Sequence, residues 1–274
     1  ATADAPGAAD NGSGVAVVLE LARVLSQYPQ RSTIIFVLFS AEEHNRQGSR
    51  VFVDEYILGQ NIDVVAMINV DTVGSWNNSR GEINDEDIRL FANPDNLDSL
   101  QLARTINFVG SYYDLSLAIE FNPQLDREGR FGDHFSFDEN GIAAVRFIEA
   151  YEDNVNREGR DTLDKIEVAY MVDCTETILG LVSALTSGPR PPKNITMRDA
   201  GGGLQSVHWE PTLGASSYVV AVRPVGSLIY TNYFPADVTY TNGWDRWGEF
   251  AGLAVAAIDA NGQIGPLSVE YDLR

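Results

Sequence analysis

Residues 33–43 read Thr-Ile-Ile-Phe-Val-Leu-Phe-Ser-Ala-Glu-Glu, and the predicted fold is built around this stretch. Its first seven residues are β-branched, aromatic or aliphatic and carry no charge, which is typical of a strand buried on both faces. Glu42 and Glu43 follow this strand, where open α/β sheets place their ligands. Adjacent side chains point in different directions, so one carboxylate could hold a cation while the other reaches a water molecule on it.

A second strand is predicted over residues 62–70, and it ends at Asp71. A helix predicted over residues 46–58 separates it from the first strand. Because strand–helix–strand units have right-handed crossovers, the two strands should run parallel and end at the same edge of the sheet. We therefore expect Glu42, Glu43 and Asp71 to converge at that edge.

Asp10 is a further candidate for this acidic site. It lies in a loop of small residues, 1–14, whose glycines permit tight backbone conformations before an amphipathic helix predicted over residues 15–25. A third buried strand, predicted over residues 143–149, also ends in acidic residues, namely Glu149, Glu152 and Asp153. The remaining predicted elements are a helix over 97–109, a strand over 115–121, a short helix over 135–140 and a long helix capped by Asp161 and Thr162.

The pattern changes beyond the linker Pro189-Arg190-Pro191-Pro192. Short alternating runs separated by turn residues follow at 206–209, 218–222, 238–240 and 250–258. Such spacing without a helical stretch is typical of a β-sandwich. We therefore predict an α/β domain over residues 1–188, with a mainly parallel sheet flanked by helices, and an all-β sandwich over residues 189–274.

The composition limits the classes of partner. The 274 residues include 39 Asp and Glu but 19 Lys and Arg, which gives a net charge of −20. This charge argues against nucleic acids and anionic membranes as partners, and it favours cations and a secreted, extracellular or periplasmic location. The single cysteine, Cys174, excludes an internal disulfide and a thiolate metal cluster. No uninterrupted apolar run approaches the ~20 residues that span a bilayer, so no membrane span is expected.

Five segments of residues 1–187 resemble, in the same order, the zinc aminopeptidases of peptidase family M28. They are Ala-Pro-Gly-Ala-Ala-Asp-Asn-Gly-Ser-Gly at 5–14, Ser-Ala-Glu-Glu at 40–43 with Gly-Ser at 48–49, Asn-Val-Asp at 69–71, Gly-Asp-His at 132–134 and Asp-Thr-Leu-Asp-Lys-Ile at 161–166. Residues 192–274 look like a fibronectin type III module, marked by Trp209, Tyr218 and the turn at 259–268. The resemblance implies a zinc-exopeptidase-like α/β fold that lacks its first strands, followed by a fibronectin type III-like β-sandwich.

The resemblance also implies a role for each acid. Asp10 would bridge two metal ions, and the peptide bond that follows it would be cis, as is common in the family. Glu43 would bind one metal and Asp71 the other. Glu42 would be the general base that takes a proton from the metal-bound water and passes it to the leaving amine. Two further residues, Asp133 and His134, match family residues that lie around the metals or the substrate.

The chain departs from the family at both histidine ligands. One histidine would precede Ala1, so the chain is expected to be incomplete at its N-terminus. The other position, four residues before Asp161, holds Arg157. Glu152 and Asp153 are the candidate substitute ligands. One or two zinc ions are the family's metals, whereas a site of carboxylates alone leans towards calcium, magnesium or manganese.

Two functions stay open at this stage. The first is a metal-dependent aminopeptidase that hydrolyses N-terminal residues from peptides, with Glu42 as its general base. The alternative is a catalytically degenerate M28-like protein that serves as a binding or structural module in an extracellular assembly. The expected partners are a peptide substrate and the missing N-terminal segment, where that segment is retained.

Overall fold

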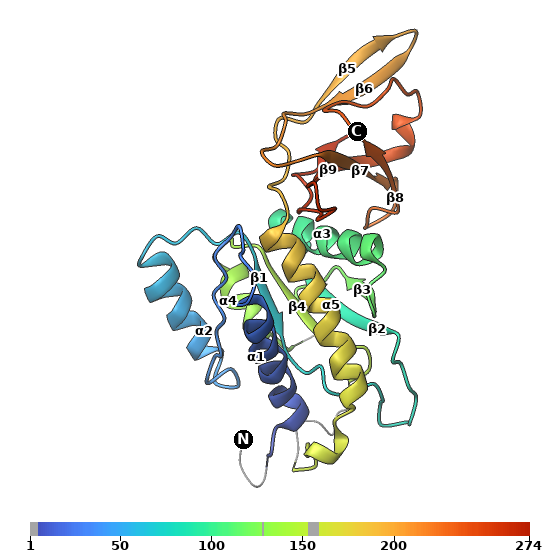
Figure 1. The fold of residues 1–274 in the computed structure, drawn as a ribbon. Helices are drawn as coiled ribbons and strands as arrows, with labels where there is room; N and C mark the ends of the chain where they lie inside the picture. Colours follow the sequence, from blue (N-terminus) through green and yellow to red (C-terminus); the bar gives the residue numbers. More distant parts are fainter. Residues whose placement is uncertain (1–4, 128, 153–158) are drawn as a thin grey trace. The chain divides into compact units, whose positions relative to one another are not determined.

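The computed structural model describes residues 5–127, 129–152 and 159–274 (Figure 1). Contacts within the chain divide it into two units, and each is described here by itself. The first unit comprises the residues up to 28, 35–103 and 114–179, and the second comprises 29–34, 104–113 and 180–274. The domain boundary expected after residue 188 stays a prediction.

A four-stranded sheet lies at the centre of the first unit. Its strands are β1 (Met67–Val70), β2 (Asp87–Ala92), β3 (Ala118–Asn122) and β4 (Ala144–Glu149), in the order β1-β4-β2-β3. Two of its pairings, β1 with β4 and β2 with β3, are parallel, and β2 with β4 is antiparallel. The mainly parallel sheet is therefore confirmed. Every residue of β4 is buried, including the charged Arg146 and Glu149.

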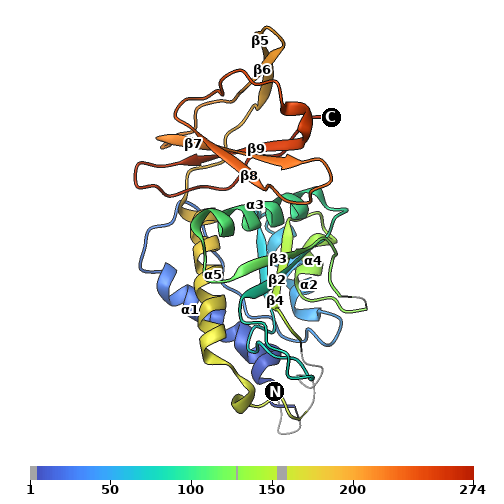
Figure 2. The same ribbon diagram turned by 90° about the vertical axis from the view of Figure 1, so that its right-hand side faces the viewer.

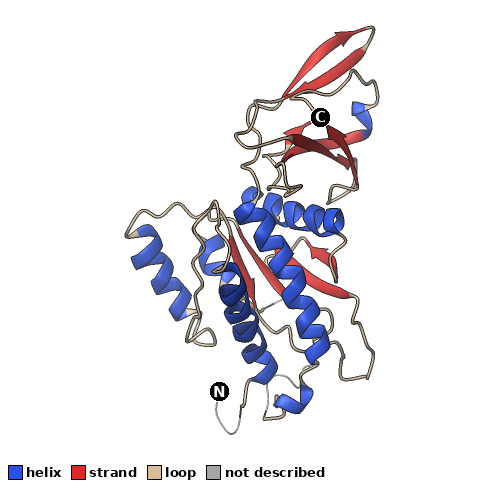
Figure 3. Cartoon of the chain, in the orientation of Figure 1, coloured by secondary structure: helices blue, strands red, loops and turns tan. Residues whose placement is uncertain are grey.

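Helices cover both faces of this sheet, as predicted. Figure 2 shows α1 and the first part of α5 on one face and α2 and α4 on the other, and Figure 3 separates helices from strands by colour. The helices are α1 (Gly14–Leu25), α2 (Gln47–Val51) with its continuation η2 (Phe52–Leu58), α3 (Leu97–Tyr113), α4 (His134–Asp138) and α5 (Val168–Ser187). Two irregular turns, η1 (Ala8–Ser13) and η4 (Leu163–Lys165), precede α1 and α5.

Residues 33–39 do not form the buried strand that their composition predicts. In the described part of the chain this segment makes no strand pairing, and Ile35, Phe36 and Leu38 are 46%, 38% and 51% exposed. An extended segment becomes a strand only when a neighbour supplies backbone hydrogen bonds. The edge strand β1 pairs with β4 instead. The predicted parallel pairing of this segment with the strand before Asp71 is therefore wrong.

Strand β2 was missing from the sequence prediction, although it lies inside the sheet. Its apolar residues Ile88 and Leu90 are fully buried and alternate with Asp87 and Arg89. The alternation is the signal that could have identified it. Strand β1 is shorter than predicted, because the pairing with β4 begins only at Met67.

Helix α5 is, among the described residues, the one helix long and apolar enough by length and composition to cross a membrane. Core helices of soluble proteins pass the same test. Tyr170, Cys174 and Ile178 of this helix are buried in the first unit. The absence of a membrane span stays a prediction.

The C-terminal segment of the second unit is built of β-strands, as predicted. Its strands are β5 (Thr196–Gly201), β6 (Leu204–His208), β7 (Ser217–Pro224), β8 (Asn232–Ala236), β9 (Phe250–Ile258) and β10 (Tyr271–Asp272). One antiparallel sheet has the order β10-β9-β7-β8, and β5 pairs with β6 separately. Trp209, Tyr218 and Trp247 pack in the core of this segment. The predicted run at 238–240 contributes only an isolated bridge to β6.

Candidate active site

Asn11 joins the loop of Asp10 to the end of strand β1. Its side-chain Nδ2 donates to the carbonyl oxygen of Val70 at 3.1 Å, and its Oδ1 accepts from the backbone N–H of Thr72 at 3.0 Å. The two contacts bracket Asp71, the residue between Val70 and Thr72. These contacts join Asn11 to residues about 60 positions further along the chain. The loops that carry Asp10 and Asp71 are therefore neighbours.

Asp161 fixes the other side of this loop. Its carboxylate accepts from the backbone N–H of Ala9 at 2.7 Å and from that of Asp10 at 3.0 Å, and the side chain is buried. The prediction that Asp161 and Thr162 cap the long helix is therefore wrong. Helix α5 begins at Val168, Thr162 makes no side-chain cap hydrogen bond, and the amides that Asp161 caps belong to the Asp10 loop. The peptide bond between Asp10 and Asn11 is cis, as the resemblance implies.

A tight turn presents Glu42 and Glu43. Ala41 has the positive φ of 57° that lets the chain turn sharply after the segment 33–39. Gly48 then lies against the backbone of Ser40 so closely that a Cβ atom at this position would overlap the Ser40 carbonyl oxygen. This close approach explains the glycine of the Gly48-Ser49 pair.

Ser49 connects this turn to Asp133. Its hydroxyl donates to Asp133 Oδ1 at 2.5 Å and lies 2.9 Å from the hydroxyl of Ser136. Asp133 is buried, so its carboxylate is fixed rather than solvated. Asp133 is thus linked through Ser49 to the turn that carries Glu42 and Glu43, which agrees with its predicted place around the metals or the substrate.

The acids Glu42, Glu43, Asp71 and Asp133 lie close enough to interact electrostatically. Burial raises the pKa of Glu42 to about 7, and the negative charges of Asp71, Glu43 and Asp133 add to this effect, while Arg146 opposes it. Glu42 therefore lies within electrostatic range of Glu43 and Asp71, although the strand predicted before Glu42 does not form.

Arg146 of strand β4 was missed by sequence reasoning. Its guanidinium is buried beneath the acids, with Nη2 2.9 Å from Asp71 Oδ2 and Nη1 2.6 Å from Asp126 Oδ2. Burial acts to lower its pKa, but the charges of Asp71 and Asp126 outweigh burial and raise it. Arg146 therefore stays protonated and orients Asp71. An arginine inside an otherwise apolar strand is the signal that could have identified it.

His134 is buried. Its Nε2 donates to the carbonyl oxygen of Leu125 at 2.7 Å, and it lies 3.9 Å from Asp126 Oδ2. Burial lowers its pKa to about 4, so the imidazole is neutral at pH 7. Because His134 lies next to Asp126, which pairs with Arg146, its position favours a role in positioning these two side chains over direct contact with a ligand.

Glu152 is paired with arginine side chains. Its carboxylate accepts hydrogen bonds from Arg127 and Arg130, so it does not serve as a free substitute ligand. The second candidate, Asp153, and Arg157 lie outside the described residues.

The described residues fit a zinc ion only in part. Carboxylate oxygens of Asp10, Glu43 and Asp71 are suitable ligands, but no histidine joins them. Within residues 5–127, 129–152 and 159–274, no three side chains of His, Cys, Asp or Glu are grouped closely enough to hold one metal ion. Arg146 also occupies one oxygen of Asp71.

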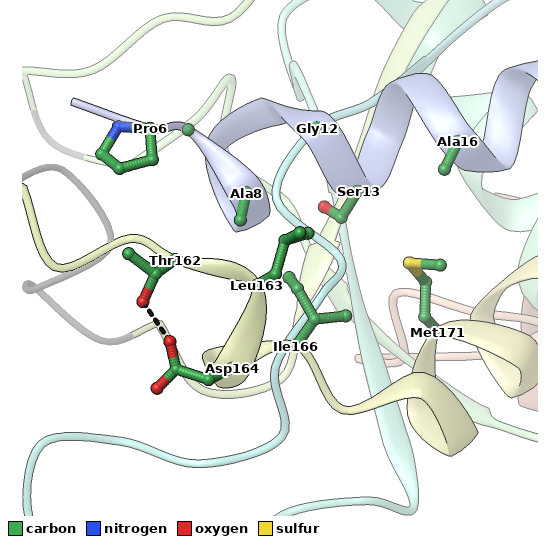
Figure 4. Close-up of a pocket in the computed structure, with 11 residues that line it drawn as sticks. Pro6, Ala8, Gly12, Ser13, Ala16, Thr162, Leu163, Asp164, Ile166 and Met171 are labelled. Carbon is green, nitrogen blue, oxygen red and sulfur yellow. Dashed lines mark hydrogen bonds between the residues drawn. The ribbon is translucent and has the colours of Figure 1, made fainter. Parts of the chain in front are cut away.

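A pocket of about 840 Å³ is lined in part by residues of the Asp10 loop (Figure 4). Its lining is mainly apolar and comes from η1, α1, η4 and α5, with Leu163, Ile166 and Met171 on one side and Ala8 and Ala16 on the other. None of the four interacting acids lines it. The pocket is therefore next to the acidic site and not part of it.

Comparisons with known proteins give the family of this fold. The model of peptidase family M28 matches residues 1–182. A probable zinc metalloprotease from Pyrenophora tritici-repentis is 30% identical over 275 residues, and one from Pyricularia oryzae is 28% identical over 271 residues. These matches cover 87% and 84% of this chain but only 62% and 53% of the two relatives.

Two solved structures have a similar fold. An aminopeptidase from Aneurinibacillus sp. strain AM-1 is 27% identical with a TM-score of 0.52, and BSAP, a zinc aminopeptidase from Bacillus subtilis, is 26% identical with a TM-score of 0.55. Each match covers 67% of this chain and 40% or 43% of the other protein. The descriptions of these relatives support zinc, and none supports calcium, magnesium or manganese.

Proposed function

The chain belongs to peptidase family M28, and from this we propose that it carries the general base and the carboxylate ligands of a zinc-dependent aminopeptidase. Membership makes it a metallopeptidase by descent. The removal of N-terminal residues from peptides is supported by its similarity to two aminopeptidases. Because the chain spans 40% and 43% of those proteins, the activity of the whole protein is a proposal.

One observation carries this proposal: the convergence of acids at the sheet edge where β1 ends. Glu42 is surrounded by Asp71, Glu43 and Asp133, and Asn11 holds the Asp10 loop against Asp71. Negative charges held this close repel one another, so the arrangement favours a bound cation.

Each residue has a distinct part in the proposed reaction. Asp10, Glu43 and Asp71 would contribute oxygen ligands, and zinc, when bound, supplies Lewis-acid activation of the scissile carbonyl group and of water. Glu42 would take a proton from the attacking water and deliver it to the leaving amine. Arg146 would keep Asp71 oriented through its 2.9 Å contact.

The test is hydrolysis of leucine p-nitroanilide by the protein with its natural upstream sequence, in the presence of zinc. Glu42→Gln keeps the size of the side chain and removes the base, and we expect kcat to fall by about 10²–10⁴-fold. The matched control is Glu55→Gln, which changes an exposed residue of η2. An E42Q variant as fast as its parent would contradict the role of Glu42.

The second candidate function is a catalytically degenerate binding protein, and one observation favours it. Arg146 is bound to Asp71, and no three metal-binding side chains are grouped in the described residues. Elemental analysis of the purified protein after incubation with zinc separates the candidates. Close to two zinc ions per chain supports the peptidase, whereas no bound zinc together with no hydrolysis supports the binding protein.

We also propose that an upstream segment of the same protein packs on the first unit. Helix α1 is apolar on two sides, with Val17 and Leu21 buried but Val15 and Leu19 exposed. A helix that is apolar on both sides is normally covered on both. The exposed segment 35–39 of the same unit is a second surface that such a segment would cover. Adding the natural upstream sequence should therefore slow amide hydrogen exchange in residues 35–39, and unchanged exchange would contradict the proposal.

A further inference from the structure

Three arginine side chains surround the carboxylate of Glu152, and we call them the arginine cluster: Arg89, Arg127 and Arg130. Arg127 and Arg130 both donate to Glu152 Oε1, the second through Nη1 at 2.7 Å. Arg89 Nη2 lies 3.9 Å from Glu152 Oε2. Arg130 is the most exposed of the three, at 34%. A single carboxylate is therefore shared by guanidinium groups from two separate segments of the chain, strand β2 and the loop that carries Arg127 and Arg130.

The arginine cluster has unused capacity for an anion. Arg89 Nη2 is buried and makes no hydrogen bond within the described residues, although its Nε donates to the Glu149 carbonyl oxygen at 2.9 Å. Arg127 is also 3.3 Å from Asp126, but Asp126 is shared with Arg146. A buried donor without a partner is costly, and guanidinium forks bind carboxylates in pairs of hydrogen bonds. The arginine cluster therefore suits a carboxylate in addition to Glu152, or one that reaches Arg89 Nη2 more closely than Glu152 does.

The arginine cluster lies beside the acidic site. Arg127 contacts Asp126, Asp126 contacts Arg146, and Arg146 contacts Asp71. The same edge of the sheet therefore presents acids on one side and arginines on the other. This charge pattern is complementary to a short peptide, whose ammonium group suits the acids and whose carboxylate suits the arginines.

We propose that the arginine cluster is a carboxylate-binding subsite, in which Glu152 is exchanged for a carboxylate of a peptide ligand. That carboxylate belongs either to the C-terminus of a short peptide or to an acidic side chain. As a substrate subsite it rests on the proposed peptidase function, whereas carboxylate binding itself does not depend on hydrolysis.

Isothermal titration calorimetry at low salt tests the subsite with three acetylated dipeptides, which have no free N-terminus and are not substrates of an aminopeptidase. They are acetyl-Ala-Ala, its C-terminal amide, and acetyl-Glu-Ala amide. We expect the carboxylate-bearing peptides to bind at least about tenfold more tightly than the uncharged amide, because a charge-assisted hydrogen bond is lost in the amide.

Variants of the cluster give opposite expected effects. Arg130→Gln should weaken binding of the carboxylate peptides by about tenfold or more. Glu152→Gln should tighten it, because the internal competitor loses its charge. The matched control is Arg23→Gln, an exposed arginine of α1 paired with Glu20. Circular dichroism verifies the fold of each variant, and if E152Q does not fold, R130Q alone decides.

Each outcome has a defined meaning. Preference for acetyl-Ala-Ala identifies the C-terminal carboxylate, and preference for acetyl-Glu-Ala amide identifies an acidic side chain; both support the subsite. Equal binding of the three peptides, or equal affinities for R130Q and R23Q, overturns it. Carboxylate binding without anilide hydrolysis would remove the proposed function but keep the subsite, and hydrolysis without carboxylate preference would do the reverse.

Discussion

Asp161 and Arg146 show how single residues hold the acidic site without lying at its reacting atoms. Asp161 accepts from the backbone amides of Ala9 and Asp10, which are 152 and 151 positions away in sequence. Arg146 bridges Asp71 and Asp126 from within β4. The acids themselves could be found from the sequence, because each follows a short recognisable motif. Their supports could not, because only folding brings them near.

Asp161→Ala should lower the free energy of unfolding by about 1–3 kcal/mol, because two amides of the Asp10 loop lose their acceptor. Urea denaturation measures this change. The control is Asp164→Ala, since the side chain of Asp164 is 71% exposed, and its unfolding curve should match that of the parent. Equal stabilities of D161A and D164A would contradict the capping role.

Arg146→Met should cost about 3–5 kcal/mol of unfolding free energy. The substitution keeps most of the side-chain volume but removes the cation of Asp71 and leaves the buried Asp126 with Arg127 alone. Arg50→Met is the control, because Arg50 is 44% exposed and makes one long ion pair. A loss below about 1 kcal/mol for R146M in chemical denaturation would mean that the ion pairs are not structural.

At the scale of elements, the helices predicted from the sequence are found in the structure, whereas some of the predicted strands are not. Helix α1 and the helix formed by α2 and η2 lie where their apolar spacing predicts, because helical hydrogen bonds are local. The segment 33–39 has the composition of a strand but makes no pairing in the described chain. The turn after it nevertheless keeps Glu42 in place, through Ala41 and the contact of Gly48 with Ser40.

Gly48→Ala should destabilise the first unit by about 1–3 kcal/mol, because the added methyl group overlaps the backbone of Ser40 and the turn must shift. Differential scanning calorimetry measures the change. Gly248→Ala is the control, since a Cβ atom there meets nothing within 4 Å and no positive φ is required. If both variants melt like the parent, the close approach does not constrain the turn.

At the scale of the whole molecule, the C-terminal β segment has an ionic contact of its own. Arg223 of β7 donates to both oxygens of Glu270, through Nε at 2.8 Å and Nη2 at 2.7 Å. Burial acts to raise the pKa of Glu270, but the hydrogen bonds from Arg223 and the charge of Arg104 outweigh burial, so the pKa is lowered. The contact therefore stabilises the folded state while Glu270 is ionised.

The second unit should lose stability as the pH falls below the ordinary pKa of Glu270, about 4.5, and through its lowered folded-state value. Above pH 4.5 this contribution is fully present. Glu270→Gln should flatten the dependence of the melting temperature on pH between 6 and 3, whereas Asp237→Asn, at an exposed position, should leave it unchanged. An identical pH profile for E270Q and its parent would contradict the linkage.

The sequence by itself determined the family, the main helices of the first unit, the all-β C-terminal segment and the motifs that contain the acids. These features depend on local periodicity and on short motifs. Only the tertiary structure decided that Arg146 binds Asp71, that Asp161 and Asn11 hold the Asp10 loop, and that Glu152 faces arginines. The physical reason is that each of these contacts joins residues distant in sequence, and a buried charge selects its partner only after the backbone has brought the two together.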